Sequence, residues 1–232
     1  MKQKQLHIPG KRLKQYEIVQ LIGSGGYCKV YQAVNIQTNE NVAIKAVAMS
    51  TFKNHGGLVG QLHDTEKQNM KLVNSNYVVR FIDEFQQNKY SYIVMEYCNQ
   101  GDIEKLWLDN NKHFSEAQTI FYVKQILRGI QDLQKCQVMH RDIKMKNILM
   151  HNDQIKLGDL GFSKSKLKFM HLVQQQQSYD IDYWYAWLHG SRSCSIQTIL
   201  QYGGYFQSRL FDLFNDLWTI TFFRLKSLNL FV

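Results

Sequence analysis

The chain has 232 residues, 44% of them hydrophobic and 20% charged, so it is long enough to bury a core and has a globular composition. Its net charge of +9 permits an anionic partner. It nevertheless lacks zinc-finger spacing, an aromatic RNA-binding motif and a dense basic run, and we expect no nucleic-acid partner. No segment approaches the roughly 20 apolar residues of a membrane helix, so we expect no membrane contact.

Cysteine usage and the first residues indicate a compartment. The four cysteines are widely spaced and form no CxxC pair, which fits free thiols in a reducing environment. The polar start Met1–Gln5 leads into no apolar run and is unlike a signal peptide. We therefore expect a cytoplasmic protein, with the nucleus as the other possibility.

Hydrophobic patterning predicts an α+β fold with two lobes. The polar and basic residues 1–14 read as a loose N-terminal arm. A β-rich lobe and a connecting hinge follow over residues 15–97, and a largely helical lobe begins over residues 98–166. The expected strands are 17–22, 30–34, 41–45, 78–85, 90–97 and 155–157, and the expected helices are 65–73 and one that starts at Ser115.

A glycine cluster lies between the first two expected strands, in Gly23-Ser24-Gly25-Gly26-Tyr27-Cys28-Lys29-Val30. Glycines let the backbone turn tightly over phosphates and present N–H donors without side chains in the way. Any hairpin can carry glycines, so the cluster alone is weak. It is not a Walker loop, which would need Gly-Lys-Ser/Thr at the start of a helix.

The next strand, Val42-Ala43-Ile44-Lys45, carries one lysine among apolar residues. A strand lysine usually faces solvent. Behind a glycine loop, Lys45 reads better as a cation for nucleotide phosphates. Its ammonium then needs a carboxylate partner, and we expect Glu66 on the first helix, with Asp64 as the alternative.

The segment His140-Arg141-Asp142-Ile143-Lys144-Met145-Lys146-Asn147 concentrates polar chemistry between apolar stretches. A carboxylate such as Asp142 can orient and deprotonate a hydroxyl, and the amide of Asn147 can ligate magnesium. Asp159, in Asp159-Leu160-Gly161 after a short strand, reads as a second metal ligand. An Asp-x-Gly in that place is also a common turn.

Together these segments resemble the eukaryotic protein kinase family, whose glycine-loop, VAIK, HRD…N and DFG motifs occur here in the same order over about residues 16–166. The resemblance implies a two-lobed fold that binds ATP and Mg²⁺ in its cleft. Three family positions differ: Cys28 stands for the third glycine, Met145 for a proline and Leu160 for a phenylalanine. None of these changes removes a charged group.

The resemblance also assigns roles. Asp142 becomes the catalytic base, Lys144 the contact to the transferred phosphate that is typical of serine/threonine kinases, and Lys45, held by Glu66, the ligand of the α- and β-phosphates. Asn147 and Asp159 become the magnesium ligands. The remaining nucleotide contacts implied are Gly23, Gly25, Val30, Ala43, the gatekeeper Met95, the hinge residues Glu96 and Cys98, Asp102 for the ribose, and Leu149.

The family pattern does not continue beyond residue 166, so the helical lobe is expected to be incomplete. Trp184–Ser193 can be encoded so that an offset of one base yields Gly-Thr-Pro-Gly-Tyr-Met-Ala-Pro-Glu, the end of a kinase activation segment. The same offset over residues 204–222 permits Asp-Ile-Phe-Ser-Leu-Gly at the family's spacing. We therefore interpret residues 167–232 as an atypical tail with a one-base frame discrepancy between about Lys166 and Asp182, or else as a divergent segment.

Two functions follow as expectations. The first is a serine/threonine protein kinase that transfers the γ-phosphoryl group of ATP to a hydroxyl of a protein substrate. The alternative is an inactive nucleotide-binding fragment without the substrate-binding lower lobe. Intact Lys45, Asp142 and Asp159 favour the first, and the atypical tail favours the second.

Overall fold

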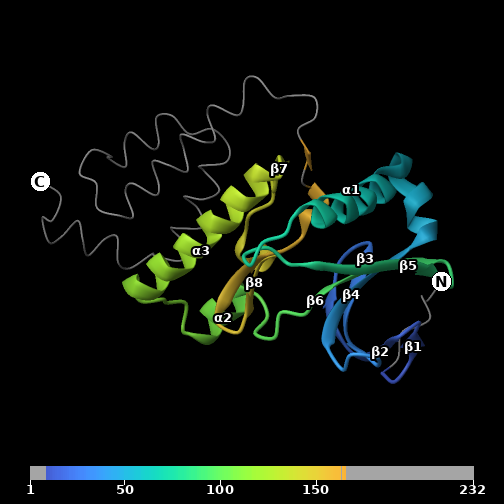
Figure 1. Ribbon diagram of the computed structural model, residues 1–232, viewed down its shortest axis with the longest axis horizontal. Helices are drawn as coiled ribbons and strands as arrows, with labels where there is room; N and C mark the ends of the chain where they lie inside the picture. The colour runs from blue at the N-terminus through green and yellow to red at the C-terminus, as the bar shows by residue number, and fades with distance from the viewer. Residues whose placement is uncertain (1–8, 163, 166–232) are drawn as a thin grey trace, which may run out of the picture. The chain divides into compact units, whose positions relative to one another are not determined.

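The computed structural model describes residues 9–162 and 164–165 (Figure 1). These residues form two compact units. Of the described residues, the first unit contains residues 9–74 together with Val79–Cys98 and Leu160–Phe162. The second contains Ser75–Val78, Asn99–Asp159 and the short segment Lys164–Ser165. Each unit is therefore built from separate stretches of the chain.

The first unit is organised around a six-stranded antiparallel sheet with the order β1-β2-β3-β4-β6-β5. Its strands are β1 (Arg12–Leu13), β2 (Tyr16–Ser24), β3 (Cys28–Asn35), β4 (Asn41–Ala48), β5 (Phe81–Gln87) and β6 (Tyr90–Glu96). Neighbouring strands are mostly joined by tight turns, which is why sequence order and spatial order nearly agree. The expected strand 78–85 begins later, at Phe81, and Val78 forms only an isolated bridge.

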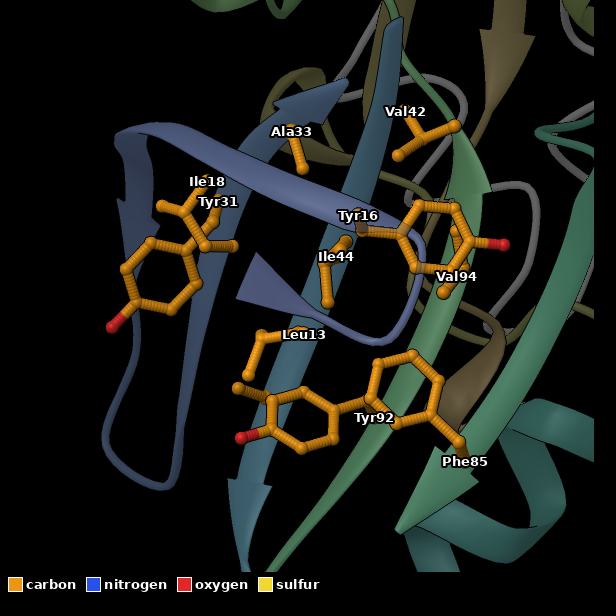
Figure 2. Packing of buried hydrophobic residues seen from close by; sticks show 11 residues of the cluster. Leu13, Tyr16, Ile18, Tyr31, Ala33, Val42, Ile44, Phe85, Tyr92 and Val94 are labelled. Atoms are coloured by element: carbon orange, nitrogen blue, oxygen red, sulfur yellow. The ribbon is translucent and has the colours of Figure 1, made fainter. Parts of the chain in front are cut away.

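Alternation of side chains gives the sheet two distinct faces, because successive residues of a strand point to opposite sides. One face carries an aromatic and aliphatic core in which Ile44 lies among the rings of Tyr16, Phe85 and Tyr92 (Figure 2). The rings of Phe85 and Tyr92 stack with centroids 4.7 Å apart. Lys45, one residue after Ile44, consequently projects from the other face.

A helix and two 3-10 turns complete the first unit. The 3-10 helix η1 (Met49–Gly57) leads into α1 (Leu58–Leu72), and η3 (Leu160–Phe162) packs against α1. The expected helix 65–73 is thus two turns longer at its N-terminus. Those first turns carry apolar residues at Leu58, Val59 and Leu62. Gly57 at the N-cap has no side chain and the first turn has no acidic residue, so no capping signal in the sequence marks the start of the helix.

As far as the structure describes it, the second unit contains two α-helices, one short β-hairpin and a second pair of short strands that lie far apart in the sequence. They are α2 (Ile103–Asp109), α3 (Glu116–Lys135), β7 (Val138–Met139), the 3-10 helix η2 (Met145–Asn147), β8 (Ile148–His151), β9 (Gln154–Leu157) and β10 (Lys164–Ser165). β8 pairs with β9, and β7 pairs with β10, both antiparallel. Helix α3 begins where the sequence predicts, since Ser115 and Gln118 form a reciprocal capping box.

The segment Ser75–Val78 is fastened to α3 and β9 of the second unit. The Ser75 hydroxyl donates to Asp132 at 2.7 Å, and the Leu157 N–H donates to the Tyr77 carbonyl at 2.8 Å. Gly129 of α3 makes this approach possible, because a Cβ there would lie 2.9 Å from both the Tyr77 oxygen and Leu157 Cδ1. The glycine is required by this contact.

The α+β fold with a β-rich and a helical unit is confirmed. One expectation needs correction: the arm 1–14 is not loose at Arg12–Leu13, since these residues form β1 and Leu13 is fully buried. A single apolar residue in a basic stretch is too weak a pattern to predict this strand. No helix in the described part of the chain is long and apolar enough to cross a membrane. The interpretation of residues 167–232 lies outside the described residues.

Candidate active site

The glycine cluster forms the hairpin between β2 and β3. Gly25 N–H donates to the Cys28 carbonyl at 2.9 Å and closes the turn, while Gly23 pairs with Val30. Val30 in turn pairs with Lys45 of β4. The loop backbone and the lysine are therefore connected through one row of paired residues in the sheet.

Other residues that are predicted to contact the nucleotide lie on the same face of the sheet as Lys45. Ala43 and Lys45 are two residues apart on β4, so their side chains share a face. Met95 of β6 lies directly opposite Ala43 in the antiparallel register, and directly opposite residues also share a face. Val30, Ala43, Lys45 and Met95 thus project from the side of the sheet that is free of the aromatic core.

Lys45 is held by a bidentate ion pair. Its Nζ lies 2.7 Å from Oε1 and 2.6 Å from Oε2 of Glu66, and the exposed fractions of the two side chains are 15% and 4%. The alternative partner, Asp64, pairs instead with Lys67 on the outer side of the helix, with 2.7 Å between Nζ and Oδ1. Of the two carboxylates that the sequence offered, Glu66 is the one bonded to Lys45.

Helix geometry explains that choice. The buried residues of α1 are Val59, His63, Glu66, Asn69 and Met70, which recur at helical spacing along its inner face. Asp64, two residues before Glu66, necessarily points elsewhere. Burying the Lys45 ammonium and the Glu66 carboxylate together has a moderate cost in free energy, because each charge is compensated by a close partner with good geometry.

In the second unit, the Asp142 carboxylate is oriented by two donors. Its Oδ2 accepts from Lys144 Nζ at 2.5 Å and from Asn147 Nδ2 at 2.9 Å. Asn147 Nδ2 also donates to the Asp142 backbone carbonyl at 2.8 Å. The 3-10 turn η2 makes these contacts possible by bringing the chain back on itself after Lys144. The carboxylate therefore has a fixed direction and a cation beside it.

His140 joins this loop to the segment before Asp159. Burial lowers the pKa of His140, so the imidazole is neutral and its two nitrogens have different roles. Nε2 lies 2.9 Å from the Gly158 carbonyl and donates to it, while Nδ1 accepts from the Asp142 N–H at 3.4 Å. Gly158 N–H donates to the Asn147 carbonyl at 2.9 Å. Asp159 consequently follows Gly158, whose carbonyl and N–H are both hydrogen-bonded.

Backbone conformation is unusual at these two places, as it is at nine other non-glycine positions among the described residues. Arg141 and Asp159 have positive φ angles of 66° and 58°, in the left-handed region that residues with a Cβ seldom adopt. Such conformations persist where surrounding contacts hold them and are common at functional sites. Here the hydrogen bonds of His140 and Gly158 supply that restraint, and the Asp159 side chain is exposed to solvent.

The oxygen ligands that Asn147 and Asp159 offer are of the kind that suits a magnesium ion. Because its amide nitrogen faces two acceptors of Asp142, its amide oxygen is the group presented to other partners. An amide oxygen and the exposed Asp159 carboxylate are the hard oxygen ligands that Mg²⁺ prefers, with phosphates and water completing its shell.

The remaining predicted nucleotide contacts include residues at the end of β6 and at the start of α2. Asp102 caps α2, with its Oδ1 accepting from the Lys105 N–H at 2.9 Å, and it forms an isolated bridge with Leu149. Glu96, at the end of β6, donates its N–H to the Arg80 carbonyl at 2.9 Å, and Cys98 is buried. The capping role of Asp102 was missed, although an Asp before Ile103 is an N-cap signal.

Sequence reasoning also missed Gly158. Its backbone N–H and carbonyl join Asn147 and His140, yet a glycine before an Asp-x-Gly turn carries no signal of such a role. The role of Gly158 becomes visible only in the structure, where its hydrogen bonds join segments that are distant in the sequence.

Comparison with known proteins places these features in a family. Residues 16–186 match the model of the protein kinase domain, somewhat further than the motifs extend. Relatives in Dictyostelium discoideum include serine/threonine-protein kinase atg1, 30% identical over 161 residues, and serine/threonine-protein kinase 4 homolog A, 36% identical over 153 residues. The matches cover 66% and 65% of this chain, but only 24% and 31% of those proteins.

A third relative from the same organism is a probable serine/threonine-protein kinase PLK, 34% identical over 156 residues, 66% of this chain and 15% of that protein. The chain thus spans less than a third of the length of these curated relatives. The family match itself covers well over half of the chain, and it includes the Lys45–Glu66 pair and the Asp142 loop. This protein belongs to the protein kinase family.

Proposed function

We propose that this kinase transfers the γ-phosphoryl group of Mg-ATP to a serine or threonine hydroxyl of a protein substrate. The observation that carries the proposal is the Asp142 carboxylate, which is oriented by Lys144 and Asn147. A fixed carboxylate with one oxygen directed by two donors can accept a proton from an incoming hydroxyl at its other oxygen.

Lys144 makes that carboxylate suited to phosphoryl transfer. Its ammonium offsets the charge of Asp142 and can also contact the transferred phosphoryl group, since a lysine has three donors. A lysine two residues after the base is the feature that points to serine and threonine as acceptors. The named relatives are serine/threonine kinases, which supports the same specificity.

Lys45 binds the α- and β-phosphates in this proposal. The bidentate contact with Glu66 fixes the ammonium on the face of the sheet that also carries Val30 and Ala43. These two small apolar side chains are suited to one face of an adenine ring. The glycine hairpin supplies backbone N–H groups for the phosphates.

Asn147 and Asp159 hold magnesium when the nucleotide is bound. The ion supplies charge neutralisation for the phosphate oxygens and helps to orient them. His140 contributes indirectly, since its hydrogen bonds tie the Asp142 backbone to Gly158, next to Asp159.

The proposal is tested on the full chain with radiolabelled ATP, Mg²⁺ and a generic basic acceptor protein. We expect label on phosphoserine or phosphothreonine, and loss of transfer by at least about a hundredfold in Asp142→Asn, the size of a general-base contribution. Asp109→Asn, an exposed aspartate at the end of α2, is the matched control and should retain activity.

Nucleotide binding is measured separately by thermal shift. Mg-ATP should raise the melting temperature of the protein, because a ligand of the native state stabilises it by mass action. Lys45→Ala should weaken that shift, whereas Lys112→Ala, an exposed lysine beyond α2, should not. Binding without any transfer would refute the enzyme proposal and favour the alternative, a nucleotide-binding fragment.

A further inference from the structure

His63 is a buried polar residue that the proposed chemistry does not use. It lies on the inner face of α1, one turn before Glu66, with only 3% of its surface exposed. Its Nε2 is 2.8 Å from the Ser91 hydroxyl of β6, which is itself buried. The hydrogen bond therefore connects the helix directly to the sheet.

Ser91 and Lys45 occupy the same face of that sheet. Lys45 lies opposite Ile93, and Val47 lies opposite Ser91, in the antiparallel β4–β6 pair. Lys45 and Ser91 are therefore diagonal neighbours on one face. On the helix, His63 and Glu66 are three residues apart and also share a face. The pairs His63–Ser91 and Glu66–Lys45 are thus two adjacent attachments of α1 to the sheet.

Two attachments matter because the start of α1 has no local restraint from a cap. Its N-cap residue, Gly57, offers no side-chain hydrogen bond, and no acidic residue occupies the first turn. Instead, Phe52 of η1 covers this end of the helix. Its ring lies 5.4 Å from that of His63, and a Cβ on Gly60 would approach it to 3.4 Å.

The chemistry around His63 favours a neutral imidazole. Burial lowers its pKa to about 4, and the nearby cations Lys67 and Lys45 act in the same direction. Asp64 and Glu84 oppose this effect more weakly. A protonated His63 would repel Lys45 and compete for the carboxylate of Glu66. A neutral ring bonded to Ser91 avoids both effects.

We propose that the His63–Ser91 hydrogen bond is a positioning contact that sets α1 so that Glu66 holds Lys45. Lys67 and Lys71 also tie the last turns of α1 to Glu84 of β5, and η3 packs against the helix. On the face that carries Glu66, the His63–Ser91 bond adds an attachment one turn nearer the N-terminus, which fixes the rotation of this end of the helix and its height on the sheet. His63 acts through Glu66 and does not touch the nucleotide. The consequence for ATP rests on the proposed function, but the effect on the Lys45–Glu66 pair does not.

The test uses the full chain and two readouts. The first is the rate at which an amine-reactive reagent labels Lys45 without nucleotide, followed by mass spectrometry. The second is the Kd for Mg-ATP. Ser91→Ala and His63→Leu should both accelerate labelling of Lys45 and raise the Kd about three- to tenfold, the range that one lost hydrogen bond corresponds to.

A matched control separates positioning from general destabilisation. Val59→Ala removes a buried apolar side chain from the same face of α1 and should lower the melting temperature without changing either readout. His63→Gln, which keeps a group able to bond Ser91, should restore much of the wild-type behaviour. In a Glu66→Gln background, Ser91→Ala should have no further effect, since its route of action is already removed.

Each outcome decides the question. If Ser91→Ala and His63→Leu change only the melting temperature, as Val59→Ala does, the contact is merely structural and the inference is wrong. If His63→Leu does not fold, Ser91→Ala, the smaller change, decides by itself whether the contact positions Glu66. If Lys45 labelling responds while Lys45→Ala leaves the Kd unchanged, the positioning contact stands and the proposed nucleotide role of Lys45 fails.

Discussion

Replacing Gly129 by alanine tests how closely Ser75–Val78 approaches α3. Gly129 lies inside α3, so an alanine gains about 1 kcal/mol of helix propensity. Against this, the new Cβ would meet the Tyr77 carbonyl oxygen and Leu157 Cδ1 at 2.9 Å each. The carbonyl cannot move freely, because it accepts the Leu157 N–H at 2.8 Å. Overpacking of this kind costs about 1–3 kcal/mol, and backbone contacts belong at the upper end.

The clash therefore exceeds the gain in propensity, and we expect Gly129→Ala to destabilise the protein by about 1–2 kcal/mol. That change lowers the melting temperature by about 2–8 °C in a domain of this size. Gly60→Ala is the matched control, since its Cβ would meet only Phe52, whose side chain lies 3.4 Å away. It should leave stability unchanged or raise it. A Gly129→Ala protein as stable as Gly60→Ala, by calorimetry or urea denaturation, would show that the close approach does not exist.

Three further predictions concern titration, salt and coding. The folded-state pKa of His63 is about 4, below its usual 6.5, so unfolding takes up a proton in this pH range. The free energy of unfolding should therefore fall between pH 6.5 and 4 by up to about 1.4 kcal/mol per pH unit. Urea denaturation should show a shallower fall in His63→Gln. The partly exposed Glu84 pairs with Lys71 at 2.7 Å and Lys67 at 3.7 Å, so Glu84→Gln should cost less than about 1 kcal/mol, and the loss should vanish in about 1 M NaCl. Transcript codons for residues 184–193 should spell Gly-Thr-Pro-Gly-Tyr-Met-Ala-Pro-Glu at a one-base offset, and incompatible codons would end that hypothesis.

Local patterns predicted most of the secondary structure and the pairing of Lys45 with Glu66. The capping residue Ser115 marked the start of α3, and the single lysine in an apolar strand marked Lys45. Both signals arise within one element, from cap chemistry and from strand alternation. The same alternation would have placed Ala43 on the face of Lys45, since they are two residues apart.

Contacts between distant segments could not be predicted from the sequence. Nothing around His63 indicates that Ser91 is its partner, because that hydrogen bond depends on how α1 packs on β6. Gly129 reads as a weak point in a helix, although the carbonyl of Tyr77 requires it. The strand at Leu13 was missed because its pairing with Tyr16 is made by a turn at Lys14, whose φ of 51° is unusual for a lysine.

The interleaving of the two units affects how the chain can fold during synthesis. The first unit needs Leu160–Phe162, which emerge from the ribosome long after its sheet is complete, and the second needs Ser75–Val78 from upstream. The first unit cannot reach its final set of contacts until residue 162 has been made, and the second cannot until residue 165, the end of β10, has been made. Cutting the chain after Cys98 would therefore separate the first unit from Leu160–Phe162 and the second unit from Ser75–Val78. We expect each piece to aggregate under conditions in which the uncut chain remains in solution.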